Sequence, residues 1–365
     1  MVLFGLIGQV AWVVENMYLN VFIYKMFNAS ASDISLMVSA SAVAATVTTI
    51  LMGALSDRVG KRKIFICGGY LVWGVTILGF ALVRMDVLTP LCGSVAEAAA
   101  LGVNLVILLD CAMTFFGSTA NDAAYNAWLT EMGDDSTRGR IEGINAMMPL
   151  VAILAVFGGF MGFNLDLAES WTVIYCIIGG IVLLIGVLGI FLIEDGKERR
   201  TLDDGAVEDQ KKESYWSNVI YSFRISTVKS NKLLYAIVGA FALFGISIQI
   251  FMPYLIVYYE KSLAMSNYVL VLAPAIILAA VFTAVYGKYY DQLGFQMSII
   301  PAIGILVAGY GILYFSVSMV PVFIGSLLMM CGYLAGMAVF GAVIRERIPE
   351  QMEGRSQGLR IIGKL

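Results

Sequence analysis

The sequence predicts an all-α polytopic membrane protein made of two related six-helix halves. Hydrophobic residues make up 60% of the 365 residues and charged residues only 13%, whereas water-soluble domains are about half apolar and about a quarter charged. Apolar runs of about 20 residues, the length that an α-helix needs to cross the hydrocarbon core, recur along the chain. A short charged motif also returns six predicted spans later, which indicates an internal repeat.

Ten spans are expected, and each is a helix because unpaired backbone groups are not tolerated in lipid. The first begins almost at the N-terminus. It contains Glu15 and lacks a basic start, which distinguishes it from a secretory signal peptide. We place the spans at about 2–27, 33–55, 64–84, 101–128, 140–163 and 171–194, and then at about 232–258, 263–286, 297–318 and 321–344.

The distribution of basic residues predicts the orientation. The only basic residues that this layout places on the opposite side from the loops after even-numbered spans are Lys25, Arg84 and Lys261, out of 23 in the chain. Because basic loops stay in the cytoplasm, the N-terminus is expected to be cytoplasmic. The expected location is the plasma or inner cell membrane, with lipid as a partner.

Two short motifs occur twice on the predicted cytoplasmic side. Gly53-x-x-x-Asp57-x-x-Gly60 matches Gly287-x-x-x-Asp291-x-x-Gly294, and Gly139-Arg140-x-x-Gly143 matches Gly354-Arg355-x-x-Gly358. Each pair lies six spans apart, which predicts an N-terminal half over 1–194 and a C-terminal half over 232–365. The charged segment 195–231 is the expected cytoplasmic linker.

The stretch G-A-L-S-D-R-V-G-K-R-K, from Gly53 to Lys63, resembles the loop 2–3 signature of the major facilitator superfamily. The resemblance implies that two halves rock about a central site, and that Asp57 docks against span eleven. Members have twelve spans, so it also implies that the second half lacks about two and stops at the start of span eleven. The residues assigned to conformational gating are Gly53, Asp57, Arg58, Gly60, Asp291, Arg140 and Arg355.

Span four carries a narrower resemblance. N-D-A-A-Y-N-A-W-L-T-E-M, followed by R-G-R, resembles the glycoside–pentoside–hexuronide:cation symporters, the melibiose-permease-like branch. This resemblance implies a role for Asp122 in sugar and cation binding and for Trp128 in sugar stacking. The branch has a pair of aspartates in span two where this chain has Ala45 and Thr46 to Thr49 and no acid, so sodium coupling by that mechanism does not carry over.

Three acidic residues lie well inside predicted spans, namely Glu15, Asp110 and Asp122, and no Lys or Arg accompanies them. Charged groups in a membrane are costly and are therefore functional candidates. They could take up and release protons or supply oxygen ligands to a cation such as Na⁺. The alternative is that neighbouring hydroxyls and amides satisfy them in a structural role.

Helical spacing groups further polar residues with these acids, since successive residues advance by about 100°. Spans one and four each carry a polar and aromatic stripe, and span seven adds Gln249. The candidate substrate- or cation-binding residues are Asp122, Asp110, Glu15, Asn16, Asn20, Trp12, Asn121, Tyr125, Trp128 and Gln249.

This lining suits a neutral polyhydroxylated solute, because amides bind hydroxyls and aromatic rings stack on sugars. The sequence therefore predicts a secondary transporter of a sugar or glycoside, coupled to H⁺ or Na⁺. Two alternatives stay open: a cationic drug/proton antiporter, and a non-transporting sensor. With no histidine, no P-loop and no paired cysteine spacing, we expect no enzyme activity, metal site or cofactor. We also expect a monomer that binds no nucleic acid.

Overall fold

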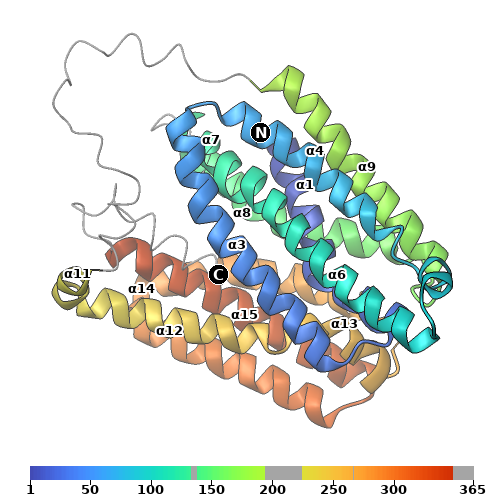
Figure 1. Ribbon diagram of the computed structural model, residues 1–365. Helices are drawn as coiled ribbons and strands as arrows, with labels where there is room; N and C mark the ends of the chain where they lie inside the picture. The colour runs from blue at the N-terminus through green and yellow to red at the C-terminus, as the bar shows by residue number, and fades with distance from the viewer. Residues whose placement is uncertain (133–137, 194–223, 266, 348–365) are drawn as a thin grey trace. The chain divides into compact units, whose positions relative to one another are not determined.

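The computed structural model of the chain describes residues 1–132, 138–193, 224–265 and 267–347. Every regular element in these ranges is a helix, which confirms the predicted all-α class (Figure 1). The chain divides into two compact units, Met1–Lys211 and Lys212–Leu365. Among the described residues, eight helices are long and apolar enough to cross a membrane.

The N-terminal unit is a bundle of long helices. The first span is continuous and comprises α1 (Val2–Val13), the π-helical segment η1 (Val14–Leu19) and α2 (Asn20–Phe27). The other elements are α3 (Ala31–Val59), α4 (Arg62–Phe80), α5 (Met85–Leu88), η2 (Thr89–Leu91), α6 (Val95–Gly117), the π-helical segment η3 (Ser118–Tyr125), α7 (Asn126–Met132), α8 (Arg138–Phe160) and α9 (Ala168–Leu192). Within this unit α4 packs along α9, and α1 packs against α8.

Local sequence signals end and start these helices. The helix of the first span ends at Asn28, which adopts the left-handed conformation with φ 52°. Ser30 then caps α3 through a capping box: its Oγ accepts from the Asp33 N–H at 3.2 Å, while its own N–H donates to Asp33 Oδ2 at 2.8 Å. Gly60 ends α3 with φ 67°, a conformation that glycine adopts without strain.

The connection between the second and third spans is shorter than the Gly53–Lys63 motif indicated. Gly53 lies inside α3, which continues to Val59, so Gly53 is not in the loop that the resemblance implied. Only Gly60 and Lys61 separate α3 from α4. Polar residues such as Ser56 are accommodated in the helix, where its hydroxyl donates to the Gly53 carbonyl at 3.1 Å.

The C-terminal unit contains α11 (Ile225–Ser230), α12 (Lys232–Gln249), η4 (Met252–Tyr254), α13 (Leu255–Val257), the π-helical segment η5 (Tyr258–Ser262), α14 (Val269–Phe315) and α15 (Met319–Arg347). The helix α14 holds two predicted spans, and Gly294 kinks it between them with φ 74° and ψ −175°. Most of the predicted linker and the whole Arg355 segment lie outside the described residues.

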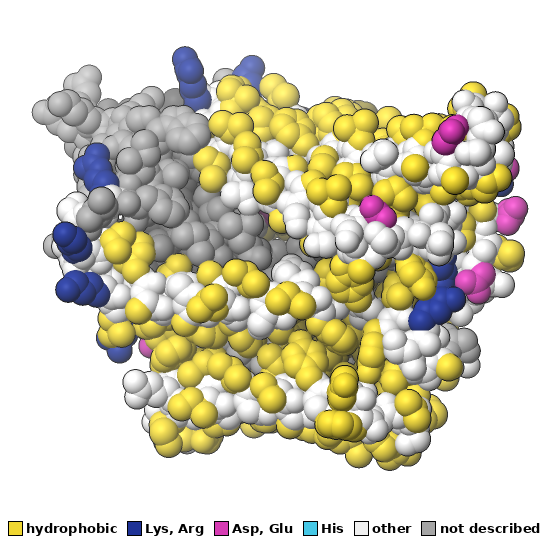
Figure 2. Space-filling view, turned by 60° about the horizontal axis from the view of Figure 1, so that its bottom comes forward, with side chains coloured by type: hydrophobic (Ala, Val, Ile, Leu, Met, Phe, Trp, Pro, Cys, Tyr) yellow, Lys and Arg dark blue, Asp and Glu magenta, His cyan; other side chains and the backbone are white. Residues whose placement is uncertain are grey.

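The helix surfaces are strongly apolar. Figure 2 shows hydrophobic side chains over most of the visible helix surface, with charged side chains near its edges. Large residues such as Leu108 on α6 and Leu184 on α9 are exposed to the surroundings. Contiguous apolar surface on this scale is typical of contact with lipid.

Candidate functional site

A buried polar cluster joins three helices of the N-terminal unit. Glu15 on η1 and Asp110 on α6 are only 8% and 2% exposed. Glu15 Oε1 accepts hydrogen bonds from Ser41 Oγ on α3 at 3.0 Å and from Thr114 Oγ1 on α6 at 2.8 Å. The two hydroxyl oxygens lie 2.7 Å from each other.

Ser41 and Thr114 both donate to Glu15, so α3, α6 and the first span meet at this carboxyl. The carboxyls of Glu15 and Asp110 are close enough to interact electrostatically. One oxygen of each, Glu15 Oε2 and Asp110 Oδ1, is buried without a hydrogen-bond partner. Among the described residues, no Lys or Arg forms an ion pair with either acid.

The π-helical segment η1 of the first span carries Glu15, and the π-helical segment η3 follows α6 in the fourth span. A π turn contains more residues than an α turn, and such segments are frequent at functional sites. The 100° spacing assumed from the sequence fails across them. Asn16 and Asn20, which the sequence placed on one stripe, accordingly differ: Asn16 is exposed, whereas Asn20 is buried.

Asparagine side chains donate hydrogen bonds to backbone carbonyls in or next to these segments. Asn126 Nδ2 donates to the carbonyls of Asn121 at 3.0 Å and of Asp122 at 3.1 Å. In the first span, Asn16 Nδ2 donates to the Trp12 carbonyl at 2.8 Å and Asn20 Nδ2 to the Asn16 carbonyl at 2.7 Å. The Nδ2 groups of Asn16, Asn20 and Asn126 are therefore engaged by their own helices, whereas Asn20 Oδ1 and Asn121 Nδ2 are buried without a partner among the described residues.

The predicted stripe on the fourth span is buried against the first span. An added Cβ on Gly8 would lie 1.7 Å from Asn121 Nδ2, so α1 and η3 are in close contact. Tyr125 donates from its hydroxyl to the Met1 carbonyl at 3.0 Å and its ring lies 6.1 Å from that of Trp128. Burial of Asn121, Tyr125 and Trp128 favours helix packing over solute contact for these residues.

Other candidates are more accessible. Asp122 is half-buried, and its carboxylate interacts electrostatically with Glu15. Trp12 is also half-buried and lies 5.1 Å from the ring of Trp73. Gln249 is exposed at the C-terminal end of α12 in the other unit.

The gating candidates are only partly described. Arg58 and Asp291 are exposed on α3 and α14, and Gly60 and Gly294 both have positive φ. Ser56 is buried and accepts a hydrogen bond from Arg62 across the turn. The side chains of Asp57 and Arg140, and all of Arg355, lie outside the described part of the structure.

Sequence reasoning missed Ser41. It is one of several hydroxyl residues in the second span, which also carries Ser35, Ser39, Thr46, Thr48 and Thr49. Nothing in the spacing alone says which hydroxyl meets Glu15.

Comparisons with known proteins agree with this architecture. The model of the Major Facilitator Superfamily matches residues 2–363. A mutant of the nucleoside transporter NupG is 12% identical, with a TM-score of 0.73 over 99% of this chain and 86% of that one. A D-xylose-proton symporter is 16% identical, with a TM-score of 0.69 over 99% and 84%.

The inward-open xylose transporter XylE from E. coli is 15% identical, with a TM-score of 0.68 over 100% of this chain and 85% of that one. A search of curated proteins gave no match. At these identities the structural likeness shows the fold, while the family model covers nearly the whole sequence. The chain therefore belongs to the Major Facilitator Superfamily and is a multi-pass integral membrane protein.

Proposed function

We propose that the chain is a secondary active transporter that moves a neutral polyhydroxylated solute, a sugar or glycoside, by alternating access. It lies in the cell membrane with a cytoplasmic N-terminus, and solute movement is coupled to a proton. The coupling site is the pair Glu15 and Asp110, with Ser41 and Thr114.

The observation that carries the proposal is the burial of two carboxyls in a membrane bundle without an ion-pair partner among the described residues. A packed apolar core would be cheaper, because buried polar groups cost free energy unless they are hydrogen-bonded. Glu15 Oε2 and Asp110 Oδ1 remain unpartnered. Such groups in a membrane are functional by default, and a carboxyl that gains and loses a proton couples naturally to a proton gradient.

The oxygens of the cluster are spaced as a hydrogen-bonded network. Glu15 Oε1, Ser41 Oγ and Thr114 Oγ1 lie 2.7–3.0 Å apart, the separation of hydrogen-bonded oxygens. Such a network supports a proton as the coupling ion, and the comparison of H⁺ and Na⁺ gradients tests this choice.

The solute class rests on chemistry and on similar proteins. The N-D-A-A-Y-N-A-W-L-T-E-M segment resembles a sugar-transporting branch, and solved structures of similar fold include a nucleoside transporter and a D-xylose-proton symporter. Trp12, Asn16 and Asp122 are the candidates with accessible surface in the first and fourth spans. The basic residues within the predicted spans, Lys25, Arg84, Arg140 and Lys232, lie at or near span ends, so none lies in a span interior to bind an anion.

The test is uptake into proteoliposomes that contain the full chain. Labelled pentoses, hexoses, disaccharides, nucleosides and a cationic dye are offered with an imposed proton gradient, a Na⁺ gradient or neither. We expect one neutral solute class to accumulate with the proton gradient alone. Glu15→Gln and Asp110→Asn should abolish accumulation but keep solute exchange at equilibrium, because exchange needs no net proton transfer.

Glu97→Gln is the matched control, since Glu97 is an exposed acid on the same helix as Asp110. Accumulation that depends only on Na⁺ would contradict proton coupling. Dye movement against the proton gradient would identify an antiporter, and absence of any flux or exchange would favour a sensor. Asp122→Asn tests the sugar-binding role, which unchanged coupled uptake would exclude.

A further inference from the structure

A cavity of about 320 Å³ lies in the N-terminal unit, and neither Glu15 nor Asp110 lines it. It lies between the end of α2, the corner formed by α4 and α5, and the start of α9. Its apolar side chains are Phe22, Met26, Phe80, Val83, Met85, Ala168 and Trp171. This volume is in the range of small-molecule sites, and the lining is mostly apolar with a few polar groups, as in such sites.

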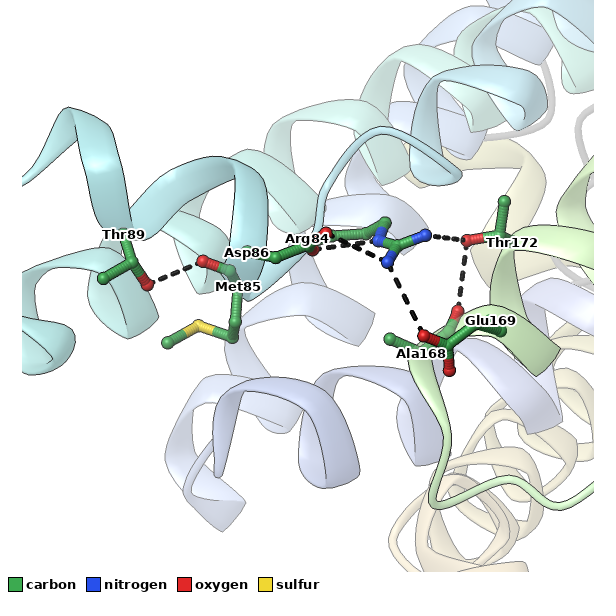
Figure 3. A network of polar contacts seen from close by, with 7 residues as sticks. All are labelled: Arg84, Met85, Asp86, Thr89, Ala168, Glu169 and Thr172. Carbon is green, nitrogen blue, oxygen red and sulfur yellow. Dashed lines mark hydrogen bonds and ion pairs between the residues drawn. The ribbon is translucent and has the colours of Figure 1, made fainter.

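A charged network built on Arg84 lines part of the cavity (Figure 3). Arg84 makes a two-pronged contact with Asp86, from Nε to Oδ1 at 2.9 Å and from Nη2 to Oδ2 at 3.0 Å. Its Nη1 donates to Thr172 Oγ1 on α9 at 3.2 Å, and Nη2 lies 3.9 Å from Glu169 Oε1. The network therefore ties the α4–α5 corner to α9.

The charged side chains that line the cavity differ in their exposure to the surroundings. The Arg84 side chain is 25% exposed, whereas those of Asp86 and Glu169 are 61% and 73% exposed. The neighbouring ion pair repeats the order, since Lys25 is withdrawn and Asp166, 3.2 Å away, is exposed. From inside to outside the site thus offers an apolar cavity, a guanidinium and then carboxylates.

The Arg84 guanidinium has further N–H groups that can donate hydrogen bonds to a ligand. A guanidinium has five N–H groups, and contacts with the described residues engage three of them as hydrogen-bond donors. Among the described residues, the exposed Glu169 carboxylate has the 3.9 Å ion pair with Arg84 as its side-chain contact. Both groups can therefore add a partner without losing the contact between Arg84 and Asp86.

The position of the cavity indicates where the ligand comes from. It lies at the Phe80 end of α4, opposite the Arg62 end with its neighbouring basic residues, and beside Ala168, where α9 begins. Helix ends flanking apolar spans lie at the level of lipid headgroups. In the proposed orientation this is the non-cytoplasmic leaflet.

We propose that this cavity binds a phospholipid with an ethanolamine headgroup. The start of an acyl chain fills the apolar part, the phosphate contacts Arg84, and the terminal ammonium contacts Glu169 and Asp86. This order of apolar chain, anion and cation matches the layers of the site. Phosphatidylcholine lacks ammonium N–H donors, and phosphatidylglycerol brings no cation to the outer carboxylates.

The experiment measures lipid binding by native mass spectrometry of the full chain, purified in detergent and stripped of lipid. Phosphatidylethanolamine, phosphatidylcholine and phosphatidylglycerol with identical acyl chains are titrated separately and in competition. We expect phosphatidylethanolamine to bind about tenfold more tightly than phosphatidylcholine, equivalent to about 1.4 kcal/mol. Glycerophosphoethanolamine, which lacks acyl chains, should not compete at equal concentration.

Two variants separate the parts of the site. Glu169→Gln should reduce the preference for phosphatidylethanolamine to about that for phosphatidylcholine, while Arg84→Gln should weaken all three lipids. Glu97→Gln, at another exposed acid near a helix start, should change nothing. Equal binding of the three lipids by the unmodified chain, or an unchanged preference in Glu169→Gln, would overturn the proposal. Solute transport is not required for this readout, so the result is independent of the proposed coupling.

Discussion

Thr114 Oγ1 donates a 2.8 Å hydrogen bond to Glu15 Oε1, joining residues 99 positions apart in the sequence. Thr114→Val keeps the shape of the side chain and removes this donor. We expect a loss of about 1–3 kcal/mol in stability, because the Glu15 oxygen loses a buried partner. Thermal melting of the purified protein measures this loss of stability.

Thr119→Val is the control on the same span. Thr119 donates only to the Phe115 carbonyl of its own helix, at 2.7 Å, and that carbonyl lies within the hydrogen-bonded helix. Its replacement should cost much less. Equal effects of the two variants would mean that the bond to Glu15 adds nothing to stability.

Gly8→Ala should destabilise the N-terminal unit by about 1–3 kcal/mol through overpacking. The added Cβ would meet Asn121 Nδ2 at 1.7 Å and the Tyr70 hydroxyl at 2.8 Å. Gly180→Ala on α9 meets no atom within 4 Å and should be neutral or stabilising. Adding Asn121→Ala to Gly8→Ala should restore part of the loss in a melting assay; no recovery would exclude this clash as the cause.

Gly60→Ala should cost about 1–2 kcal/mol, because Gly60 ends α3 with φ 67° and residues with a Cβ are strained there. No atom lies within 4 Å of the added Cβ, so the cost is conformational rather than steric. Gly60→Asn should cost less, since asparagine tolerates this region better. Melting temperatures in the order Gly, Asn, Ala test the argument, and a neutral alanine variant would refute it.

Asn126→Asp should destabilise the π-helical segment η3. It keeps the side-chain shape but replaces the two N–H donors to the carbonyls of Asn121 and Asp122 with a carboxylate oxygen. The expected loss is about 1–3 kcal/mol, accompanied by faster hydrogen exchange over Ser118–Tyr125. Asn16→Asp, at an exposed site with a similar bond to Trp12, is the control and should lose less.

Asp86 makes the Arg84 network sensitive to acid. The hydrogen bonds from Arg84 hold the pKa of the Asp86 carboxyl below its ordinary value. A group whose pKa is lowered by folding contributes stability above its unfolded pKa, here about 3.9, and loses it as the pH falls through the folded value. The stability difference between the unmodified chain and Asp86→Asn should therefore be constant from pH 5 to pH 8 and shrink below about pH 4. A difference that grows on acidification would contradict this assignment.

The sequence determined that this is an all-α membrane protein, because several independent features of the sequence all indicate it. These features are the long apolar runs, the few charges and the basic residues confined to certain loops. Each one indicates whether a segment prefers lipid or water. The Gly53–Lys63 segment also carried the family resemblance, which the match to residues 2–363 supports. The sequence also predicted that these segments are helices, because a segment in the membrane must form the hydrogen bonds of its backbone internally.

The same evidence could not place side chains across the π-helical segments. Asn16 and Asn20 are four residues apart, which places them on one face of an α-helix, yet Asn20 is buried while Asn16 is exposed. An assumed α-helical period misplaces residues beyond a π turn, because that turn rotates the following face.

The Arg84 cavity was likewise invisible in the sequence. Arg84 and Thr172 lie 88 residues apart, and neither stands in a recognisable motif. The sequence by itself determined which segments enter the membrane, because hydropathy is a property of each segment. Only the tertiary structure decided which hydroxyl meets Glu15 and which residues surround Arg84, because contacts between helices depend on their rotation and depth against one another.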